Sequence, residues 1–210
     1  MLFLGKVVLD EIIGTNYIVG KMYAASEFAE NKIDHISTFE AMNFAAAKKI
    51  IGKLKTPLLV KLNDSMKGRG ILKFTSKQKA LDFLKKNPRG YIIQEYVPID
   101  HDYRVMVIDG KALGVMKRYV PEKDFRTNIY GTKAEQVLLT KKLAKISIEA
   151  TKAMNYDIAG IDILKQDGKF KIIEVNIAPE WQKFKKITGI NPAQEIVKAA
   201  LKKYKRKHGF

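Results

Sequence analysis

Two acidic residues and one amide lie in a stretch that the sequence predicts to be a β-hairpin. The stretch runs from Gly160 to Asn176, with Asp162 in its first strand and Glu174 in its second. Because side chains two residues apart in a strand point to the same face, Glu174 and Asn176 share one face. Carboxylate and amide oxygens are ligands of hard cations such as magnesium, often together with substrate phosphates. The pattern therefore predicts a magnesium site that faces a phosphorylated substrate.

The turn of this hairpin decides whether Asp162 joins that face. Residues 166–168 suit a three-residue loop with glycine in the left-handed region, which would bring Asp162 to the face of Glu174. A two-residue loop would turn it to the other face. We expect the three-residue loop, with Ile173 and Val175 pointing into the core. The alternative is a solvated hairpin with incidental acids, which the otherwise apolar strands disfavour.

A second candidate lies upstream, where a strand precedes a glycine-containing loop. The strand, residues 58–62, is apolar except for Lys61, and a lone charge is seldom buried without a partner. The loop that follows contains Lys67, Gly68 and Gly70, and its glycines let backbone amides approach an anion closely. A loop of this kind is usually a plain hairpin. With Lys61 directly before it, we expect a flap that covers phosphate groups.

Composition restricts the class of protein. The chain has 210 residues, 46% of them hydrophobic, and a formal net charge of +17. This length permits one substantial core or two small lobes, and no apolar run is long enough to span a bilayer. The absence of Cys excludes disulfides and thiolate sites, and we expect a cytoplasmic protein without a membrane partner. The positive charge favours anionic partners, although lysine is spread over the whole chain apart from a dense run at residues 202–208.

Hydrophobic periodicity and turn signals predict the elements that must position these residues. Helices are expected at four places, namely residues 37–55, 75–86, 140–154 and the segment that follows Asn191. Strands are expected over 91–97 and on both sides of the Asp109-Gly110 turn, over 104–108 and 111–116. In the last helix, Ile196, Ala200 and Tyr204 are expected to form the inner face.

Taken in order and with their spacing, these motifs resemble the ATP-grasp superfamily, and closely the RimK-like carboxylate–amine ligases. The matching residues are Pro57 to Lys61, Gly68-Arg-Gly70, Gln94-Glu95-Tyr96, Asp102-Tyr-Arg104, Lys117-Arg118, Asp124 to Asn128, Gly160-Ile-Asp162, Glu174-Val-Asn176 and Thr188-Gly189. Each motif alone is weak, but the ordered set is specific. The resemblance implies an α+β ATP-grasp fold, in which two lobes with antiparallel sheets grip a nucleotide. It places a small lobe at residues 20–95 and a large lobe at 96–205, between a remnant or linker at 1–19 and a basic tail at 206–210.

The resemblance also implies roles for single residues, with ATP as the nucleotide and magnesium, or manganese in its place, as the metal. The residues that would bind the nucleotide are Lys21, Lys61, Lys67, Gly68, Gly70, Gln94, Glu95, Tyr96 and Asp102. The residues that would hold two magnesium ions are Asp162, Glu174 and Asn176. The residues that would stabilise charge in the transition state are Arg104, Arg118, Arg126 and Asn128. Guanidinium suits that role because it matches carboxylate and phosphate in bidentate fashion. A surface ion pair is the alternative for each arginine, and for Arg104 the two interpretations are level.

The implied reaction joins a small carboxylate to an amine. The carboxylate attacks the γ-phosphate of ATP and becomes an acyl phosphate, and the amine then displaces phosphate to form an amide. The amine is expected to be an amino acid such as glutamate, and an acidic peptide is a further candidate acceptor. Two departures from the family matter. About 19 residues precede Lys21 where relatives carry a separate domain, so we expect a fragment, a minimal enzyme, or a chain that needs a partner domain or forms a homo-oligomer. Trp181, in the loop after Asn176, is expected to reshape the acceptor site.

Two other functions remain open at this point. The first is an ATP-binding subunit that has no turnover of its own. The second is a basic nucleic-acid-binding module, which is disfavoured because aromatic residues are not interleaved with the basic residues in the manner of single-strand readers.

Overall fold

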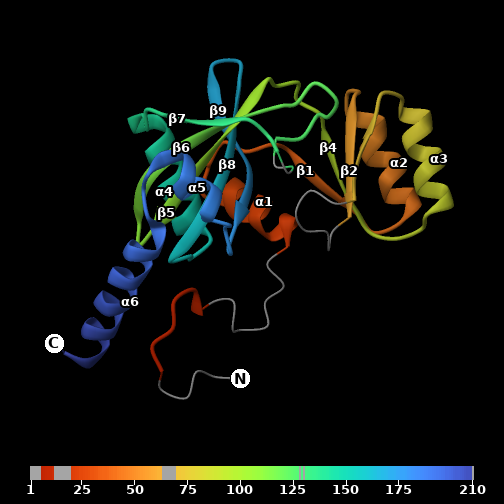
Figure 1. Cartoon of the computed structure of the whole chain (residues 1–210). Coiled ribbons are helices and arrows are strands. Elements are labelled where there is room, and N and C mark those ends of the chain that lie inside the picture. The colour runs from red at the N-terminus through yellow and green to blue at the C-terminus, as the bar shows by residue number, and fades with distance from the viewer. Residues whose placement is uncertain (1–5, 12–19, 63–69, 128, 130, 210) are drawn as a thin grey trace.

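The computed structural model describes residues 6–11, 20–62, 70–127, 129 and 131–209, and it contains two antiparallel sheets (Figure 1). The sheet on the right of Figure 1 has four strands in the order β1-β4-β2-β3, and the sheet on the left has five in the order β7-β6-β5-β8-β9. Helices pack on both sheets. The α+β architecture expected from the sequence is therefore confirmed.

The four-stranded sheet is built from strands that pair only with their antiparallel neighbours. Its strands are β1 (Thr38–Ala41), β2 (Leu58–Leu62), β3 (Ile71–Phe74) and β4 (Tyr91–Glu95). Helices α2 (Phe44–Lys53) and α3 (Lys77–Lys86) cover one face of it. Their apolar sides, with Ile51 and Leu84 at the centre, meet Leu58, Val60 and Ile93 in one core.

The five-stranded sheet carries a helical layer on each face. Its strands are β5 (His101–Ile108), β6 (Lys111–Tyr119), β7 (Ala134–Val137), β8 (Ile158–Gln166) and β9 (Lys169–Asn176). On one face, α1 (Lys21–Glu30) and α4 (Lys141–Ala153) contribute Phe28 and Leu143 to the largest core. On the other face, α5 (Gln182–Thr188) and α6 (Pro192–His208) contribute Phe184 and Ala199 to a smaller core. The expected lobe division at residue 95 coincides with the end of β4. Phe28, from the segment assigned to the small lobe, packs against the large sheet, and the domain boundaries stay a prediction.

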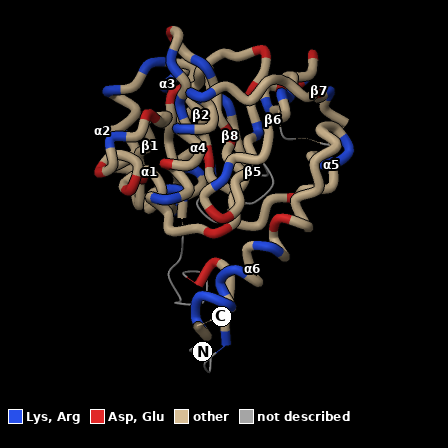
Figure 2. The backbone as a smooth tube through the Cα atoms, turned by 90° about the vertical axis from the view of Figure 1, so that its left-hand side faces the viewer, with Lys and Arg blue, Asp and Glu red and all other residues tan. Residues whose placement is uncertain are grey.

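Positive charge is not confined to one part of the fold. Lys and Arg positions lie over both sheets and their helices and run along α6, which projects from the rest of the chain (Figures 1 and 2). No helix among the described residues has the length and apolar character needed to cross a bilayer.

Helix α2 begins later than the sequence indicated. Residues 38–41 form strand β1, and the Thr38 hydroxyl donates to the carbonyl of Ile36 instead of capping a helix. The cap is Asn43, whose Oδ1 accepts from the backbone N–H of Ala46 at 2.9 Å. Residues 37–40, Ser-Thr-Phe-Glu, read as a capping box that would start the helix expected over 37–55. That interpretation was wrong because pairing of β1 with β4 satisfies the backbone of this segment, and tertiary pairing overrides a local cap.

The inner face expected for the last helix is confirmed at Ile196 and wrong at Tyr204. Asn191 is its N-cap residue, but its side chain makes no capping bond. Ala199 is buried and Ile196 is partly buried against the five-stranded sheet, whereas Tyr204 is 49% exposed. The Tyr204 ring packs against His208 at a tilt, with 4.4 Å between ring centroids and 39° between ring planes.

The β8–β9 hairpin reaches the expected register by a different route. Its turn is a two-residue loop, Asp167-Gly168, with φ of 50° and 77°, so the expected three-residue loop was wrong. A β-bulge then inserts one extra residue, Ile173, because Ile163 pairs with Ile172 whereas Asp162 pairs with Glu174. The bulge reverses the alternation of β9, so that Ile172 takes the core position assigned to Ile173. The bulge, and not the turn, brings Asp162 to the face of Glu174.

The β5–β6 hairpin also contains a β-bulge that sets its register. Its Asp109-Gly110 turn has φ of 48° and 70°, as the sequence predicts for a tight hairpin. Between Met106 and Val107 the register shifts by one residue, which places Asp102 opposite Arg118. Without that bulge the neighbour of Asp102 across the strands would be Lys117, and Arg118 would point to the other face.

A buried aspartate ties the segment before α1 to the five-stranded sheet. Asp10 Oδ1 accepts from the backbone N–H of Asp157 at 2.6 Å and from that of Ile158 at 3.1 Å. Asp10→Ala would leave both amides without this acceptor, which costs about 1–3 kcal/mol. Urea unfolding is expected to show that loss, and Asp10→Asn, which keeps an accepting Oδ1, is expected to lose less. Equal losses in the two variants would show that the acceptor atom does not matter.

Candidate functional site

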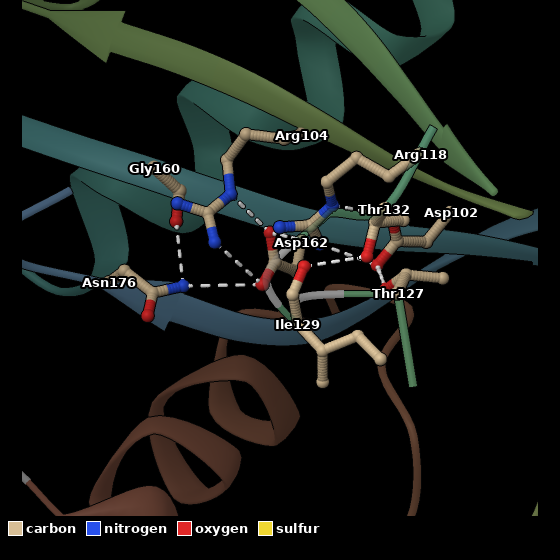
Figure 3. Close-up of polar contacts among 9 residues, drawn as sticks. All are labelled: Asp102, Arg104, Arg118, Thr127, Ile129, Thr132, Gly160, Asp162 and Asn176. Carbon is tan, nitrogen blue, oxygen red and sulfur yellow. Dashed lines mark hydrogen bonds and ion pairs between the residues drawn. The ribbon is translucent and has the colours of Figure 1, made fainter. Parts of the chain in front are cut away.

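Four charged side chains alternate in sign across three neighbouring strands (Figure 3). Arg118 of β6 donates from Nε to Asp102 Oδ1 at 2.8 Å and from Nη2 to Asp102 Oδ2 at 2.5 Å. The same Nη2 lies 2.9 Å from Oδ1 of Asp162 on β8. Arg104 of β5 donates to both carboxylate oxygens of Asp162, with 3.0 Å between Nη2 and Oδ2. We call the four residues Asp102, Arg118, Asp162 and Arg104 the charged row.

Burial makes these charges interdependent. Burial disfavours a charged carboxylate at Asp162, which is 3% exposed, but the guanidinium groups of Arg104 and Arg118 outweigh it and hold the Asp162 pKa below its usual range. Burial likewise disfavours a charged Arg118, but Asp162 and Asp102 outweigh it and raise the Arg118 pKa. At Asp102, by contrast, burial outweighs the Arg118 guanidinium and raises the pKa of the carboxyl group.

Gly160 makes room for one end of the charged row. A Cβ at this position would lie 2.8 Å from Nη1 of Arg104 and 2.8 Å from Cβ of Pro179. The absence of a side chain lets the Arg104 guanidinium lie flat across β8 toward Asp162. The resemblance gave no such reason for this glycine.

The three residues expected to bind magnesium lie together on this face of the sheet. Asn176 donates from Nδ2 to Asp162 Oδ2 at 3.4 Å and to the Gly160 carbonyl at 3.3 Å, so its Oδ1 points away from the charged row (Figure 3). Glu174 is directly opposite Asp162 and its side chain is 36% exposed. Lys21, at the start of α1, holds its ammonium 3.8 Å from Glu174 Oε1. Their expected proximity is confirmed, and their role as metal ligands stays a prediction.

The three candidate ligands differ in how readily their oxygens could bind a hard cation. Asp162 accepts from two nitrogens of Arg104, one of Arg118 and one of Asn176, which uses the roughly four lone-pair positions of a carboxylate. Glu174 and Asn176 Oδ1 present oxygens that suit magnesium as they stand. Asp162 would ligate a metal only by giving up one of its guanidinium donors.

Lys61 is a buried cation with no close partner among the described residues. It lies in β2 and is 7% exposed, and within the described ranges no hydrogen bond or ion pair holds its ammonium. Burial lowers the pKa of Lys61 to about 8, with Glu174 opposing this effect and Lys21 adding to it. Because a buried charge without a partner is costly, this position favours an anionic ligand.

The residues expected to line the adenine slot lie at the end of β4. The Gln94 side chain is buried and donates to the Thr38 hydroxyl at 2.7 Å, and Glu95 accepts from the backbone N–H of Lys55 at 2.7 Å. Tyr96 meets Phe125 edge to face with 6.0 Å between ring centroids. The ammonium of Lys73 lies 3.7 Å from the Tyr96 ring centroid, a contact that sequence reasoning missed. A flat aromatic ligand that bound here could contact both the Tyr96 ring and the Lys73 ammonium.

Arg126 forms an ion pair with a carboxylate outside the charged row. It pairs with Asp124, with 2.9 Å from Nε to Oδ1 and 2.6 Å from Nη2 to Oδ2. The Arg126 guanidinium lowers the pKa of Asp124 to about 2. Asn128, Lys67 and Gly68 lie outside the described residues. Gly70 is described, and its φ of 67° together with a bond from Leu62 N to its carbonyl closes the β2–β3 connection.

Three further residues belong to the Asp102 end of the charged row. Thr127 donates from Oγ1 to Asp102 Oδ2 at 2.5 Å, and Lys183 of α5 donates to the Thr132 carbonyl at 2.8 Å. Thr127 stands inside the quoted family motif, so its proximity to Asp102 was within reach of sequence reasoning. Lys183 lies on a helix that was not predicted, and no local pattern pointed to it.

Solved structures identify the fold. A D-alanine–D-alanine ligase from Bacillus anthracis superimposes with a TM-score of 0.67 at 20% sequence identity, over 90% of this chain and 69% of that chain. The ATP-grasp ligase PsnB, complexed with a minimal precursor, superimposes with a TM-score of 0.69 at 17% identity, over 87% of this chain and 60% of that chain. At these identities the likeness shows the fold, which is ATP-grasp.

Sequence comparison identifies the family. The model of the RimK-like ATP-grasp domain matches residues 20–200, and the chain belongs to that family. A probable alpha-L-glutamate ligase 1 from Shewanella oneidensis is 35% identical over 150 residues, which cover 67% of this chain and 49% of that protein. The chain thus spans about half the length of the curated relatives that it matches.

Proposed function

We propose that the chain is the catalytic ATP-grasp portion of a carboxylate–amine ligase that activates its acid as an acyl phosphate. The observation that carries the proposal is Lys61, a buried cation that has no ion-pair partner among the described residues and interacts electrostatically with the Glu174 carboxylate. A cation and a carboxylate at the same site suit a phosphate group that carries a metal ion. The cation can contact phosphate oxygens, and the carboxylate can hold the metal. Relatives named as alpha-L-glutamate ligases support glutamate as one substrate.

Each group has a part in this proposal. Lys61 and Lys21 bind the phosphates of ATP, and Tyr96 with Lys73 holds the adenine. Glu174 and Asn176 would hold magnesium, and Asp162 would join them only if it released a guanidinium. The bound metal would neutralise phosphate charge. Arg104 or Arg118, once released, steadies the negative charge that grows as phosphate moves to the acid.

The reaction then balances without a further reagent. The acid oxygen bonds to the γ-phosphorus while the bond to the β-phosphate oxygen breaks, and ADP leaves. The amine nitrogen bonds to the acyl carbon, the carbon–oxygen bond to phosphate breaks, and the nitrogen loses a proton. The surrounding side chains position both substrates and stabilise charge, which is the larger part of catalysis in phosphoryl transfer.

Trapping of the acyl phosphate tests the proposal. The chain is incubated with ATP, magnesium and a panel of carboxylic acids that includes glutamate and glutamate-ended peptides, with hydroxylamine as the amine. We expect a hydroxamate and ADP with at least one acid. The acid-stimulated rate is expected to fall at least a hundredfold in Glu174→Gln. ATP binding without hydroxamate for any acid would favour the alternative of a nucleotide-binding subunit.

A further inference from the structure

Helix α6 has apolar side chains on two of its sides, and the five-stranded sheet covers only one of them. On the covered side, Ile196 and Ala199 pack in the smaller core. On the other side, Val197, Leu201 and Tyr204 are 58%, 55% and 49% exposed. These three residues lie on successive turns, since a helix turns by about 100° per residue, and we call them the outer stripe. A helix that packs on a sheet by one side is ordinarily polar on the other, so the outer stripe points to a binding partner.

The side chains around the outer stripe are basic. Residues 196–208 include six Lys or Arg and no Asp or Glu, and Figure 2 shows these positions along α6. Three of them form ion pairs with carboxylates, namely Lys198, Lys202 and Lys203. Within the described part of the chain, no carboxylate pairs with Lys205 or Arg206 in the last turn. A basic helix with an exposed apolar stripe favours an anionic partner that also has an apolar part.

The size of the outer stripe and its charge decide between the possible partners. A stable protein complex buries about 800 Å² on each partner, from about 20–30 residues, and three side chains one turn apart fall far short of that. A second copy of α6 would also bring like charges together. An anionic lipid surface needs no such area, because shallow insertion of a few apolar side chains and attraction of Lys and Arg to the headgroups act together. The observations therefore favour a lipid surface.

We propose that the outer stripe and the basic residues around it bind the surface of an anionic lipid bilayer. Leu201 and its two neighbours in the stripe enter the boundary between headgroups and acyl chains. Lys205 and Arg206 lay their aliphatic stems beside the stripe and reach headgroup phosphates with their charged ends. Helix α6 lies along the surface and does not cross it, so the lack of an apolar run long enough to span a bilayer does not bear on this contact. The proposal is independent of the proposed function.

Binding of the full chain to vesicles tests the apolar part of the proposal. The chain is sedimented with vesicles of phosphatidylcholine alone and with vesicles of equimolar phosphatidylcholine and phosphatidylglycerol. We expect binding to the mixed vesicles and little to the neutral ones. Leu201→Gln is expected to lower the partition coefficient on the mixed vesicles at least fivefold. The matched control is Leu138→Gln, which removes an 84% exposed leucine outside α6 and is expected to change nothing.

A second pair of variants tests the charge of α6 against the charge of the whole chain. The double variant Lys205→Gln with Arg206→Gln is expected to lower the partition coefficient at least tenfold, because it removes two cations beside the stripe. The control is Lys85→Gln with Lys86→Gln, which removes the same charge from exposed positions of α3. That control is expected to stay within about twofold of the unaltered chain.

The contrary results are specific. Absence of binding to the mixed vesicles would overturn the proposal, and so would an equal loss in the α6 variants and their controls, which would assign the attraction to the net charge of +17. Binding unchanged in Leu201→Gln would remove the stripe from the contact and overturn it too. A dimer in sedimentation velocity that dissociates in Leu201→Gln would assign the stripe to a second copy instead. Hydroxamate formation is expected to be unchanged in Leu201→Gln, so this proposal and the ligase proposal fail separately.

Discussion

Replacing Lys61 by methionine is expected to make the chain more stable and at the same time to weaken its binding of ATP. The fall in the Lys61 pKa from its ordinary 10.5 to about 8 corresponds to a cost of about 3 kcal/mol for keeping this group charged in the folded chain. Methionine keeps most of the apolar stem and removes the charge. We therefore expect the free energy of unfolding at pH 7 to rise by about 1–3 kcal/mol.

Binding is expected to change in the opposite direction. In the proposed site the Lys61 ammonium contacts ATP phosphates in a buried position, where truncating one partner of a charged contact costs about 2–5 kcal/mol. The dissociation constant for ATP with magnesium, measured by calorimetry, is thus expected to rise at least thirtyfold. Lys49→Met, at an exposed position of α2, is the control and is expected to change neither quantity.

The pH dependence gives an independent check on the same group. ATP affinity needs Lys61 protonated, so the affinity is full at pH 7 and declines as the pH rises through about 8. Stability moves the other way, because the folded pKa of Lys61 lies below the unfolded one. The cost of its charge is full below pH 8 and disappears as the pH rises toward 10.5. Both trends are expected to vanish in Lys61→Met. A loss of stability in that variant would mean that Lys61 has a structural ion-pair partner.

The hairpins show what sequence could and could not predict about this site. The residues of the β8–β9 hairpin and the shared face of Asp162 and Glu174 were predictable from alternation. The combination of turn and bulge that produces this shared face was not predictable. The two-residue turn alone would place Asp162 on the wrong face, and the bulge at Ile173 corrects it. A bulge depends on the packing of the neighbouring strands, and no local sequence pattern indicated this one.

The ion pairs of the charged row were likewise only partly predictable from the sequence. Arg104 and Arg118 were predictable at one end of the β5–β6 hairpin, since a turn signal fixes which ends of two strands meet. The pairing of Arg118 with Asp102 depends on the second bulge, and the pairing of Arg104 with Asp162 depends on β5 lying beside β8. Strand order is decided by the whole sheet, so these partners could come only from the structure.

Capping signals were reliable only where the following residues were free to be helical. The signal at residues 75–78 marks the start of α3, although Ser76 and not Thr75 is the cap, and apolar positions at helical spacing follow directly. Thr140 caps α4, at the position where the periodicity predicted that helix to begin. The Ser37-Thr38 signal failed because β4 offers Thr38 and its neighbours a strand partner. Helix α5 was missed because its seven residues are too few for a clear period, and Lys183 was missed with it.

The last pair of variants separates the two acids of the proposed metal site. Asp162→Asn is expected to destabilise the chain by about 3–5 kcal/mol, because it removes the charge that balances two buried guanidinium groups. Glu174→Gln is expected to cost less than about 1 kcal/mol, because the Glu174 side chain is 36% exposed and its contact with Lys21 is a long one of 3.8 Å. Urea unfolding of the two variants measures this contrast.

Metal dependence is expected to follow the opposite order. In the unaltered chain, magnesium is expected to tighten ATP binding at least tenfold, and in Glu174→Gln that difference is expected to disappear while the fold is kept. Glu174 has the greater effect because no guanidinium group of the described residues engages its oxygens, whereas each oxygen of Asp162 already accepts from arginine. The matched measurement is ATP affinity with and without magnesium in both variants. Magnesium dependence retained in Glu174→Gln would place the metal away from β9, and with it the phosphates that Lys61 is proposed to bind.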